Sequence, residues 1–295
     1  MRFGLVILPQ QRWSEAEPMW RRAEALDFDH AWTYDHLAWR TLVDEPWFAT
    51  VPTLAAAALV TSRIRLGTFV ASPNYRHPVP FAKEVMSLDD LSAGRFVLGF
   101  GAGGIGVDAT VLGEPLLTPG ERVRRLDEFV GLLDTLLTQP VTDHQGERYA
   151  AVGARMYPGP FGTSRPPFVL AANGPRALDV AVARGEGWVT TGMEDMPDVA
   201  SWWRGVAELG ERLDAALERA GRTDAVADHE LFPRYLSLDS KEFALDNVAR
   251  FEDMVGRAAE LGFTDVIVHH PRPDGIYAGD PAILDDVAAL LPRLR

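Results

Sequence analysis

Eight short runs rich in β-branched and aromatic residues recur along the chain, and longer segments with helical periodicity separate them. The runs begin near Arg2, His30, Ile64, Arg95, Pro167, Gly187, Leu231 and Thr264. Several runs are almost continuously apolar, as parallel strands buried on both faces must be. Eight strand–helix units in 295 residues predict an α/β fold of the (β/α)8 TIM-barrel type rather than two doubly wound sheets.

The segments between the runs carry signals for helix ends. Thr118 offers an N-cap hydroxyl before Pro119, and Glu121 follows three residues after the cap. The helix predicted to follow has one apolar face, at Leu126, Phe129, Val130, Leu133, Leu136 and Leu137. Three other helices are expected to end before a glycine that suits a left-handed cap, at Gly94, Gly221 and Gly262.

No linker or shift in composition divides the chain, so residues 1–295 are predicted to form a single barrel domain. The fourth and fifth runs start about 72 residues apart, at Arg95 and Pro167, which leaves room for an insertion. Residues 141–161 contain Gly146, Gly153 and Pro158 and predict a small hairpin or irregular excursion, which we expect to cover the barrel.

Charge and composition exclude several classes of function. The 29 basic and 42 acidic residues give a net charge of −13, which opposes binding to nucleic acid or to an anionic membrane. The chain has no cysteine, so disulfides, thiolate catalysis and cysteine zinc sites are excluded. No apolar run approaches the length of about 20 residues that spans a membrane. We therefore expect a cytoplasmic protein.

Chemistry in such barrels is carried by residues at the C-terminal ends of the strands. Leu8-Pro9-Gln10 after the first run provides no metal ligands, and the fourth run ends without the acid that a glycosidase needs. No metal is therefore predicted. Gly99, Gly101 and Gly104 match a dinucleotide-binding pattern, but no acid follows in the required register. These glycines instead favour close approach of a flat ring or a phosphate to bare backbone.

The order and spacing of the strand-end motifs resemble the luciferase-like monooxygenase superfamily, the barrel enzymes similar to bacterial luciferase. The motifs are Asp35-His36-Leu37, Ile64 to Thr68 with Ser72 to Pro78, Leu88 to Arg95 with Leu98 to Gly101, and Asn173 to Leu178. The resemblance spans almost the whole chain. It implies an oxidoreductase that uses reduced flavin mononucleotide (FMN) or the deazaflavin coenzyme F-420 (F420).

The resemblance also implies roles for individual residues. His36 matches a catalytic or cofactor-facing histidine that could move a proton, although its ring could instead be held by Asp35 or by backbone. A cis peptide bond is implied at Phe69–Val70, beneath the ring of the cofactor. The cofactor-binding residues implied are Asp35, Phe69, Val70, Ser72, Gly101, Gly103, Asn173, Gly174, Arg176 and Thr191. Trp39 and Trp47 are expected to contact the substrate.

The resemblance leaves three functions open. The first is a monooxygenase that uses reduced FMN and oxygen on an unidentified small organic substrate. The second is an F420-dependent oxidoreductase that transfers hydride, and the third is a non-catalytic flavin-binding barrel. Gly104 stands where sugar-phosphate dehydrogenases of this superfamily carry an acid, which argues against that reaction. A homodimer and a separate flavin or deazaflavin reductase as a partner are also expected.

Overall fold

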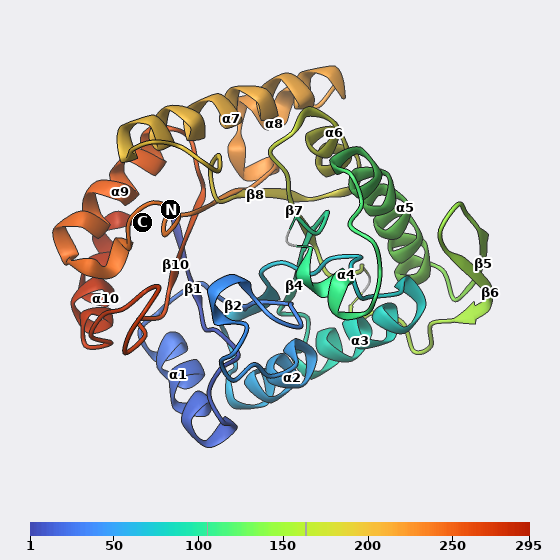
Figure 1. The fold of residues 1–295 in the computed structure, drawn as a ribbon, viewed down its shortest axis with the longest axis horizontal. Helices are drawn as coiled ribbons and strands as arrows, with labels where there is room; N and C mark the ends of the chain where they lie inside the picture. Colours follow the sequence, from blue (N-terminus) through green and yellow to red (C-terminus); the bar gives the residue numbers. More distant parts are fainter. Residues whose placement is uncertain (105, 163) are drawn as a thin grey trace.

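The computed structural model describes residues 1–104, 106–162 and 164–295. Eight parallel strands close into a barrel in the order β1-β10-β9-β8-β7-β4-β3-β2 (Figure 1). The barrel strands are β1 (Arg2–Val6), β2 (His30–Thr33), β3 (Arg65–Thr68), β4 (Phe96–Gly101), β7 (Phe168–Ala171), β8 (Gly187–Thr190), β9 (Arg234–Ser237) and β10 (Asp265–His269). The predicted (β/α)8 barrel is therefore confirmed.

Long helices surround the barrel, and each follows one of its strands (Figure 1). They are α1 (Trp13–Ala25), α2 (Thr50–Val60), α3 (Pro78–Leu91), α5 (Pro119–Thr138), α6 (Pro175–Arg184), α7 (Val199–Arg219), α9 (Val248–Glu260) and α10 (Ile283–Leu294). Shorter helical segments lie in the loops, namely α4 (Val107–Val111), α8 (Thr223–Ala227) and the 3-10 turns η1 (Arg40–Leu42), η2 (His229–Leu231) and η3 (Ala244–Asp246).

The predicted helix ends are confirmed. The Thr118 side chain accepts a hydrogen bond from the Glu121 N–H, and the Glu121 carboxylate accepts one from the Thr118 N–H, which completes a capping box at the start of α5. The three cap glycines all have positive φ, with values of 79° at Gly94, 74° at Gly221 and 77° at Gly262. Local sequence therefore decides where these helices begin and end.

The seventh barrel strand begins at Arg234, three residues later than the run that starts at Leu231. Residues His229–Leu231 form η2 instead, because the Asp228 side chain accepts a hydrogen bond from the Glu230 N–H and caps that turn. Pro233 directly precedes the strand and has no N–H for a ladder. The expected strand start was therefore wrong at this end.

The insertion between the fourth and fifth barrel strands is an antiparallel hairpin of β5 (Val141–Gln145) and β6 (Ala150–Arg155). It lies at the outer side of α5, away from the barrel axis (Figure 1). The expectation that this segment covers the barrel was wrong. The hairpin instead extends the outer surface beside α5, where the Glu128 carboxylate accepts the backbone N–H groups of residues 148 and 149.

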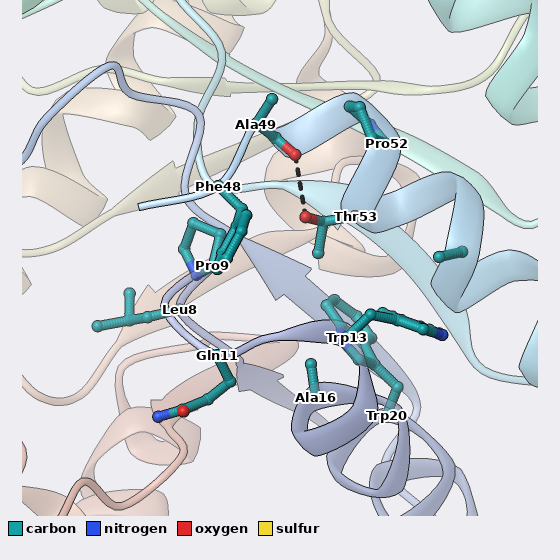
Figure 2. A pocket seen from close by; sticks show the side chains of 11 residues that line it. Leu8, Pro9, Gln11, Trp13, Ala16, Trp20, Phe48, Ala49, Pro52 and Thr53 are labelled. Carbon is teal, nitrogen blue, oxygen red and sulfur yellow. Dashed lines mark hydrogen bonds between the residues drawn. The ribbon is translucent and has the colours of Figure 1, made fainter. Parts of the chain in front are cut away.

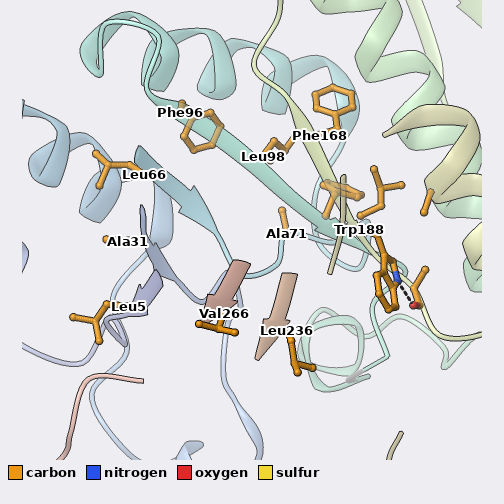
Figure 3. Packing of buried hydrophobic residues seen from close by; sticks show 14 of the residues in the cluster. Leu5, Ala31, Leu66, Ala71, Phe96, Leu98, Phe168, Trp188, Leu236 and Val266 are labelled. Carbon is orange, nitrogen blue, oxygen red and sulfur yellow. Dashed lines mark hydrogen bonds between the residues drawn. The ribbon is translucent and has the colours of Figure 1, made fainter. Parts of the chain in front are cut away.

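Side chains alternate along every barrel strand between the helix layer and the barrel interior. Large apolar residues such as Phe96, Leu98 and Trp188 face the helices (Figure 3). The residues at the alternate positions of the strands fill the interior, namely Val6, Trp32, Val97, Val169, Val189, Tyr235 and Ile267. Gly67 leaves space for this filling, because a Cβ at that position would lie 2.3 Å from the Trp32 ring.

A buried polar network closes the N-terminal end of the barrel. The Trp32 indole donates to His30 Nδ1 at 2.6 Å, so the His30 proton lies on Nε2 and is donated to Asp265 Oδ1 at 3.1 Å. Arg2 makes two further hydrogen bonds to the same carboxylate. Burial alone raises the pKa of Asp265, but the hydrogen bonds from His30 and Arg2 outweigh it and lower the pKa to about 2.

Substitution Asp265→Asn is expected to lower the free energy of unfolding by about 2–3 kcal/mol at pH 7. The carboxyl titrates near pH 3.9 when unfolded and near 2 when folded, so this stabilisation is complete above about pH 4 and is lost as the pH falls toward 2. Urea unfolding of both proteins at pH 7, 4 and 3 measures the difference. Asp253→Asn, at an exposed carboxylate, is the control. A difference that does not shrink between pH 4 and 3 would contradict the assignment.

Candidate functional site

A cavity of about 580 Å³ opens at the C-terminal ends of β2, β3, β4, β7 and β8. This volume lies within the range of cofactor and small-molecule sites. Most of the predicted site residues line it, namely His36, Trp39, Phe69, Val70, Ser72, Gly101, Gly103, Asn173 and Thr191. Tyr34, Arg40, Gly104 and Arg122 also contribute to the wall. The structure therefore brings residues from five separate strand ends into one site.

His36 is held at the edge of this cavity by a carboxylate. Its Nδ1 lies 2.7 Å from Oδ2 of Asp108, and the Asp108 side chain is fully buried. Because an ionised carboxylate only accepts hydrogen bonds, Nδ1 carries the proton and Nε2 keeps a lone pair. Within the part of the chain that the structure describes, Nε2 has no hydrogen-bond partner. His36 therefore presents a basic nitrogen at the cavity.

Sequence reasoning missed Asp108. It lies on α4, a helix of five residues, and its Oδ1 also accepts the Leu37 N–H at 2.7 Å. The sequence feature that could have indicated Asp108 is the presence of an acidic residue four positions after Gly104. A short helix in the loop after β4 carries this acid back to the end of β2, so its role depends on tertiary structure.

Trp47, which was predicted to contact the substrate, does not line the cavity. Its indole donates to the His36 carbonyl oxygen at 2.8 Å. Trp47 therefore fixes the backbone of His36, and Trp39 is the indole that lines the cavity.

The cis peptide bond implied at Phe69–Val70 is present. The end of β3 approaches β4 so closely that a Cβ on Gly99 would lie 2.0 Å from the Thr68 carbonyl oxygen. A Cβ on Gly101 would lie 2.9 Å from Val70. Close packing against Thr68 and Val70 therefore accounts for the bare backbone at Gly99 and Gly101, and Gly101 also lines the cavity. At Gly104 an added Cβ would meet no described atom within 4 Å.

Asn173 is positioned on the opposite wall by two hydrogen bonds. Its amide nitrogen donates to the Gly192 carbonyl oxygen at 2.8 Å, and its oxygen accepts the Thr190 hydroxyl at 2.7 Å. Gly174 and Arg176, predicted with it as cofactor-binding residues, are exposed at the start of α6 and lie outside the cavity wall. Any contact they make with a ligand must therefore lie beyond the mouth of the cavity.

Asp35, predicted as a cofactor-binding residue, does not reach the cavity. Its buried carboxylate accepts two hydrogen bonds from Arg76, both at 2.6 Å, and one from the Tyr75 hydroxyl at 2.5 Å. Arg76 also pairs with Glu84 on α3. Asp35 therefore ties the end of β2 to the loop after β3, and its role is structural.

The other half of the barrel mouth is filled by side chains. His269 Nδ1 lies 2.9 Å from Asp239, so its Nε2 accepts a hydrogen bond from the Tyr34 hydroxyl at 2.8 Å. Burial raises the pKa of Tyr34 well above its usual value, which keeps this hydroxyl a donor. Tyr277 stacks on His269 with ring centroids 3.8 Å apart. These contacts confine the open cavity to the side of β2, β3, β4, β7 and β8.

A second cavity of about 340 Å³ lies outside the barrel between α1 and α2. Figure 2 shows its wall, which includes Trp13, Trp20, Phe48 and Pro52. None of the residues that line it is titratable, so it offers no acid, base or charge for catalysis. The cavity at His36 is the better candidate for an active site.

In residues 1–104, 106–162 and 164–295, no group of three or more His, Asp or Glu side chains is arranged to hold a metal ion. No helix in the same ranges combines the length and apolar character needed to cross a membrane.

Comparison with known proteins supports the resemblance seen in the sequence. The family described as luciferase-like monooxygenase matches residues 1–277. An F420-dependent glucose-6-phosphate dehydrogenase of Amycolatopsis mediterranei is 32% identical over 92% of this chain and 83% of its own length. The 4-hydroxyprotoasukamycin monooxygenase of Streptomyces nodosus subsp. asukaensis is 33% identical over 78% of this chain, which spans 62% of that enzyme.

A solved structure of an F420-dependent secondary alcohol dehydrogenase, in complex with an F420-acetone adduct, has the same fold. It superimposes with a TM-score of 0.79 over 100% of this chain and 99% of that one, at 17% identity. The named relatives are oxidoreductases and monooxygenases, and the family match extends over most of the chain. The chain belongs to the luciferase-like monooxygenase family, and it is an oxidoreductase of the flavin or deazaflavin type.

Proposed function

We propose that this chain is an F420-dependent oxidoreductase that transfers hydride to or from a small organic substrate with a hydroxyl or carbonyl group at the reacting carbon. The observation that carries the proposal is the imidazole of His36, oriented by Asp108 with Nε2 at the cavity. Support also comes from the F420-dependent dehydrogenase of A. mediterranei, which aligns with 92% of this chain.

The residues present fit a deazaflavin or flavin ring. The cavity has the volume of a cofactor site, Phe69 and Val70 offer an apolar surface on one side, and Asn173 and Thr191 offer polar groups on the other. When bound there, the deazaflavin supplies a ring carbon that accepts or returns a hydride. The chain itself supplies orientation, exclusion of water and a proton acceptor.

His36 would move the proton that accompanies hydride transfer. Nε2 of His36 would accept the O–H proton of an alcohol as the alcohol is oxidised, with the bound deazaflavin supplying the hydride acceptor. Asp108 accepts the Nδ1 proton in a hydrogen bond, so it stabilises the imidazolium that forms. In the reverse direction the same nitrogen returns the proton to the carbonyl oxygen.

The substrate is proposed to be neutral at the reacting end. Gly104, where an acid stands in sugar-phosphate dehydrogenases of the superfamily, faces open space and offers no side chain for catalysis. Glucose 6-phosphate is therefore not proposed as the substrate. Trp39 lines the cavity beside His36, and its indole favours an apolar group next to the reacting carbon.

The second candidate is a monooxygenase that uses reduced FMN and oxygen. It is supported by the relative from S. nodosus, which is 33% identical, and by the largely apolar cavity wall, which would exclude water.

A separate reductase that supplies reduced cofactor remains a prediction for either function, as does a cytoplasmic location. A non-catalytic barrel is disfavoured because the His36–Asp108 pair is intact.

Replacing His36 by Gln tests the proposed role directly. We expect kcat for F420-dependent oxidation of secondary alcohols to fall about 10²–10⁴-fold, because the proton acceptor is lost. The dissociation constant for F420, measured by fluorescence quenching, should change less than about threefold, since the ring still has its cavity. Absence of F420 binding in the native chain, together with tight binding of FMN, would favour the second candidate instead.

Replacing Asp108 by Asn tests the positioning of His36. The two Asp108 oxygens accept the Nδ1 proton of His36 and the Leu37 N–H, and an amide has only one acceptor oxygen, so one of these contacts is lost. The neutral amide also stabilises an imidazolium less than the carboxylate does, so kcat should fall on the order of 10²-fold. Asp108→Glu should recover part of the rate, whereas F420 affinity should be unchanged in both variants. Asp253→Asn on α9, an exposed position, is the matched control. An Asp108→Asn enzyme with native kcat would show that the pair has no role in turnover.

A homodimer formed through α2 is also proposed. This helix, Thr50–Val60, contains no charged residue, and Leu59 leaves 71% of its surface exposed. A surface helix normally carries charged or polar residues on its outer face, and α2 carries no charge there. Light scattering should therefore give twice the mass of the chain, and Leu59→Glu should yield monomers. Val152→Glu, at a residue 89% exposed on the hairpin, should leave the mass unchanged. A native chain that is monomeric at micromolar concentration would refute this proposal.

A further inference from the structure

The second cavity, between α1 and α2, follows from the pattern of large and small residues on these two helices. Trp13, Ala16 and Trp20 succeed each other at steps of three and four residues, so they share one face of α1. Ala16 on α1 and Ala56 on α2 both line the cavity. These small side chains leave a space of about 340 Å³ at a place where two helices normally pack closely.

The wall of this cavity is aromatic and apolar. Figure 2 shows Trp13 and Trp20 of α1 on one side and Phe48 and Pro52 on the other. None of the residues that line the cavity is charged, so an ionic ligand would lose its hydration there without gaining a partner. The volume falls in the range of small-molecule sites, and it exceeds the volume of about 150 Å³ at which an apolar cavity binds benzene.

One polar group in the wall has no partner. The Trp20 side chain is fully buried, and its Nε1 forms no hydrogen bond with any residue that the structure describes. A buried indole N–H normally donates to an acceptor, and leaving it unpaired costs free energy. Because Trp20 lines the cavity, a molecule bound there can bring the acceptor that this N–H lacks.

The other polar groups of the wall suit an organic molecule better than a buried water. The Thr53 hydroxyl already donates to the Ala49 carbonyl oxygen at 2.9 Å, and Gln11 is exposed. A buried water needs about two to four polar partners. An aromatic molecule with a single acceptor needs only the Trp20 N–H, and its ring matches the apolar remainder of the wall.

The cavity lies against the segment that holds the backbone of His36. Phe48 lines the cavity, and the residue before it, Trp47, donates to the His36 carbonyl oxygen at 2.8 Å. Two residues after Phe48, the Thr50 hydroxyl donates to the Tyr34 carbonyl oxygen at 2.7 Å. A ligand in this cavity would therefore contact a segment, residues 47–50, that also supports one wall of the first cavity.

We propose that the second cavity is a binding site for a small uncharged aromatic molecule that carries one hydrogen-bond acceptor. The ring would contact the aromatic and proline side chains of the wall, and the acceptor would receive the Trp20 N–H. The inference does not depend on the proposed function, because this cavity lies outside the barrel and shares no lining residue with the cavity at His36.

The test uses benzonitrile and phenylacetylene, which have nearly the same shape, although only the nitrile is a good hydrogen-bond acceptor. Each is titrated into the full chain by calorimetry. The indole N–H signal of Trp20, assigned by its loss in Trp20→Phe, is followed by NMR. We expect benzonitrile to bind about 3- to 10-fold more tightly than phenylacetylene, because it gains one neutral hydrogen bond, and to shift the Trp20 signal.

Variants place the site. Trp20→Phe should remove the preference for benzonitrile, whereas Trp203→Phe, at an indole on α7 that does not line this cavity, should keep it. Ala16→Leu should weaken the binding of both probes by about tenfold or more, because the added atoms occupy the space of the ring. Thermal unfolding checks that Ala16→Leu folds, and if it does not, the two tryptophan variants decide.

Hydrogen exchange tests the contact with residues 47–50. The Phe48 N–H donates to the Pro9 carbonyl oxygen at 2.7 Å. Its exchange should slow when benzonitrile is bound, because local opening of this segment would break the site. An unchanged exchange rate at saturating benzonitrile would contradict the proposed position of the ligand.

A second copy of the chain is the alternative occupant, because Pro52 and Ala56 of α2, the helix of the proposed dimer, also line the cavity. Probes that bind Leu59→Glu monomers but not the native chain would assign the cavity to the partner subunit and overturn the proposal. Equal affinities of the native chain for the two probes would overturn it as well, as would benzonitrile binding that a folded Ala16→Leu variant leaves unchanged.

Discussion

Closure of the barrel is the constraint on which the rest of the structure depends. β1 pairs in parallel with β10, from Arg2 opposite Asp265 to Val6 opposite His269, so every barrel strand has two neighbours and no sheet edge remains. All strands therefore end on the same side, and residues distant in sequence meet there. His36 and Asp108, 72 positions apart, become partners only because β2 and β4 end at the same mouth.

The parts of the fold that could be predicted are those with a local cause. Short, almost continuously apolar runs mark the strands. The capping box at Thr118 and the glycines at 94, 221 and 262 mark helix ends, because each signal acts within a few residues. The start of β9 was misjudged because a side-chain cap at Asp228 competes with strand formation. Asp108 could not be assigned, since its partner is fixed by a loop that returns across the barrel mouth.

The glycines at the end of β4 and just after it show a different limit of prediction from sequence. Their presence indicates that something approaches the backbone closely, but sequence does not identify what approaches. At Gly99 and Gly101 it is the end of β3, at 2.0 Å and 2.9 Å from the missing Cβ, and at Gly103 it is the Asn74 side chain, at 2.5 Å. At Gly104 an added Cβ would meet no described atom within 4 Å, so close packing of a neighbour does not explain this glycine.

Asp35 and His36 are adjacent titratable residues, and their positions after β2 give their side chains different surroundings. Consecutive side chains at the end of a strand point in opposite directions, so only one of the two can face the cavity. Asp35 points outward and is neutralised by Arg76, which removes it from the cavity wall. His36 faces inward and needs a different carboxylate, which Asp108 provides. The Asp35-His36 motif therefore supplies one structural tie and one imidazole that faces the cavity, and the orientation of that imidazole depends on an acid that the motif does not contain.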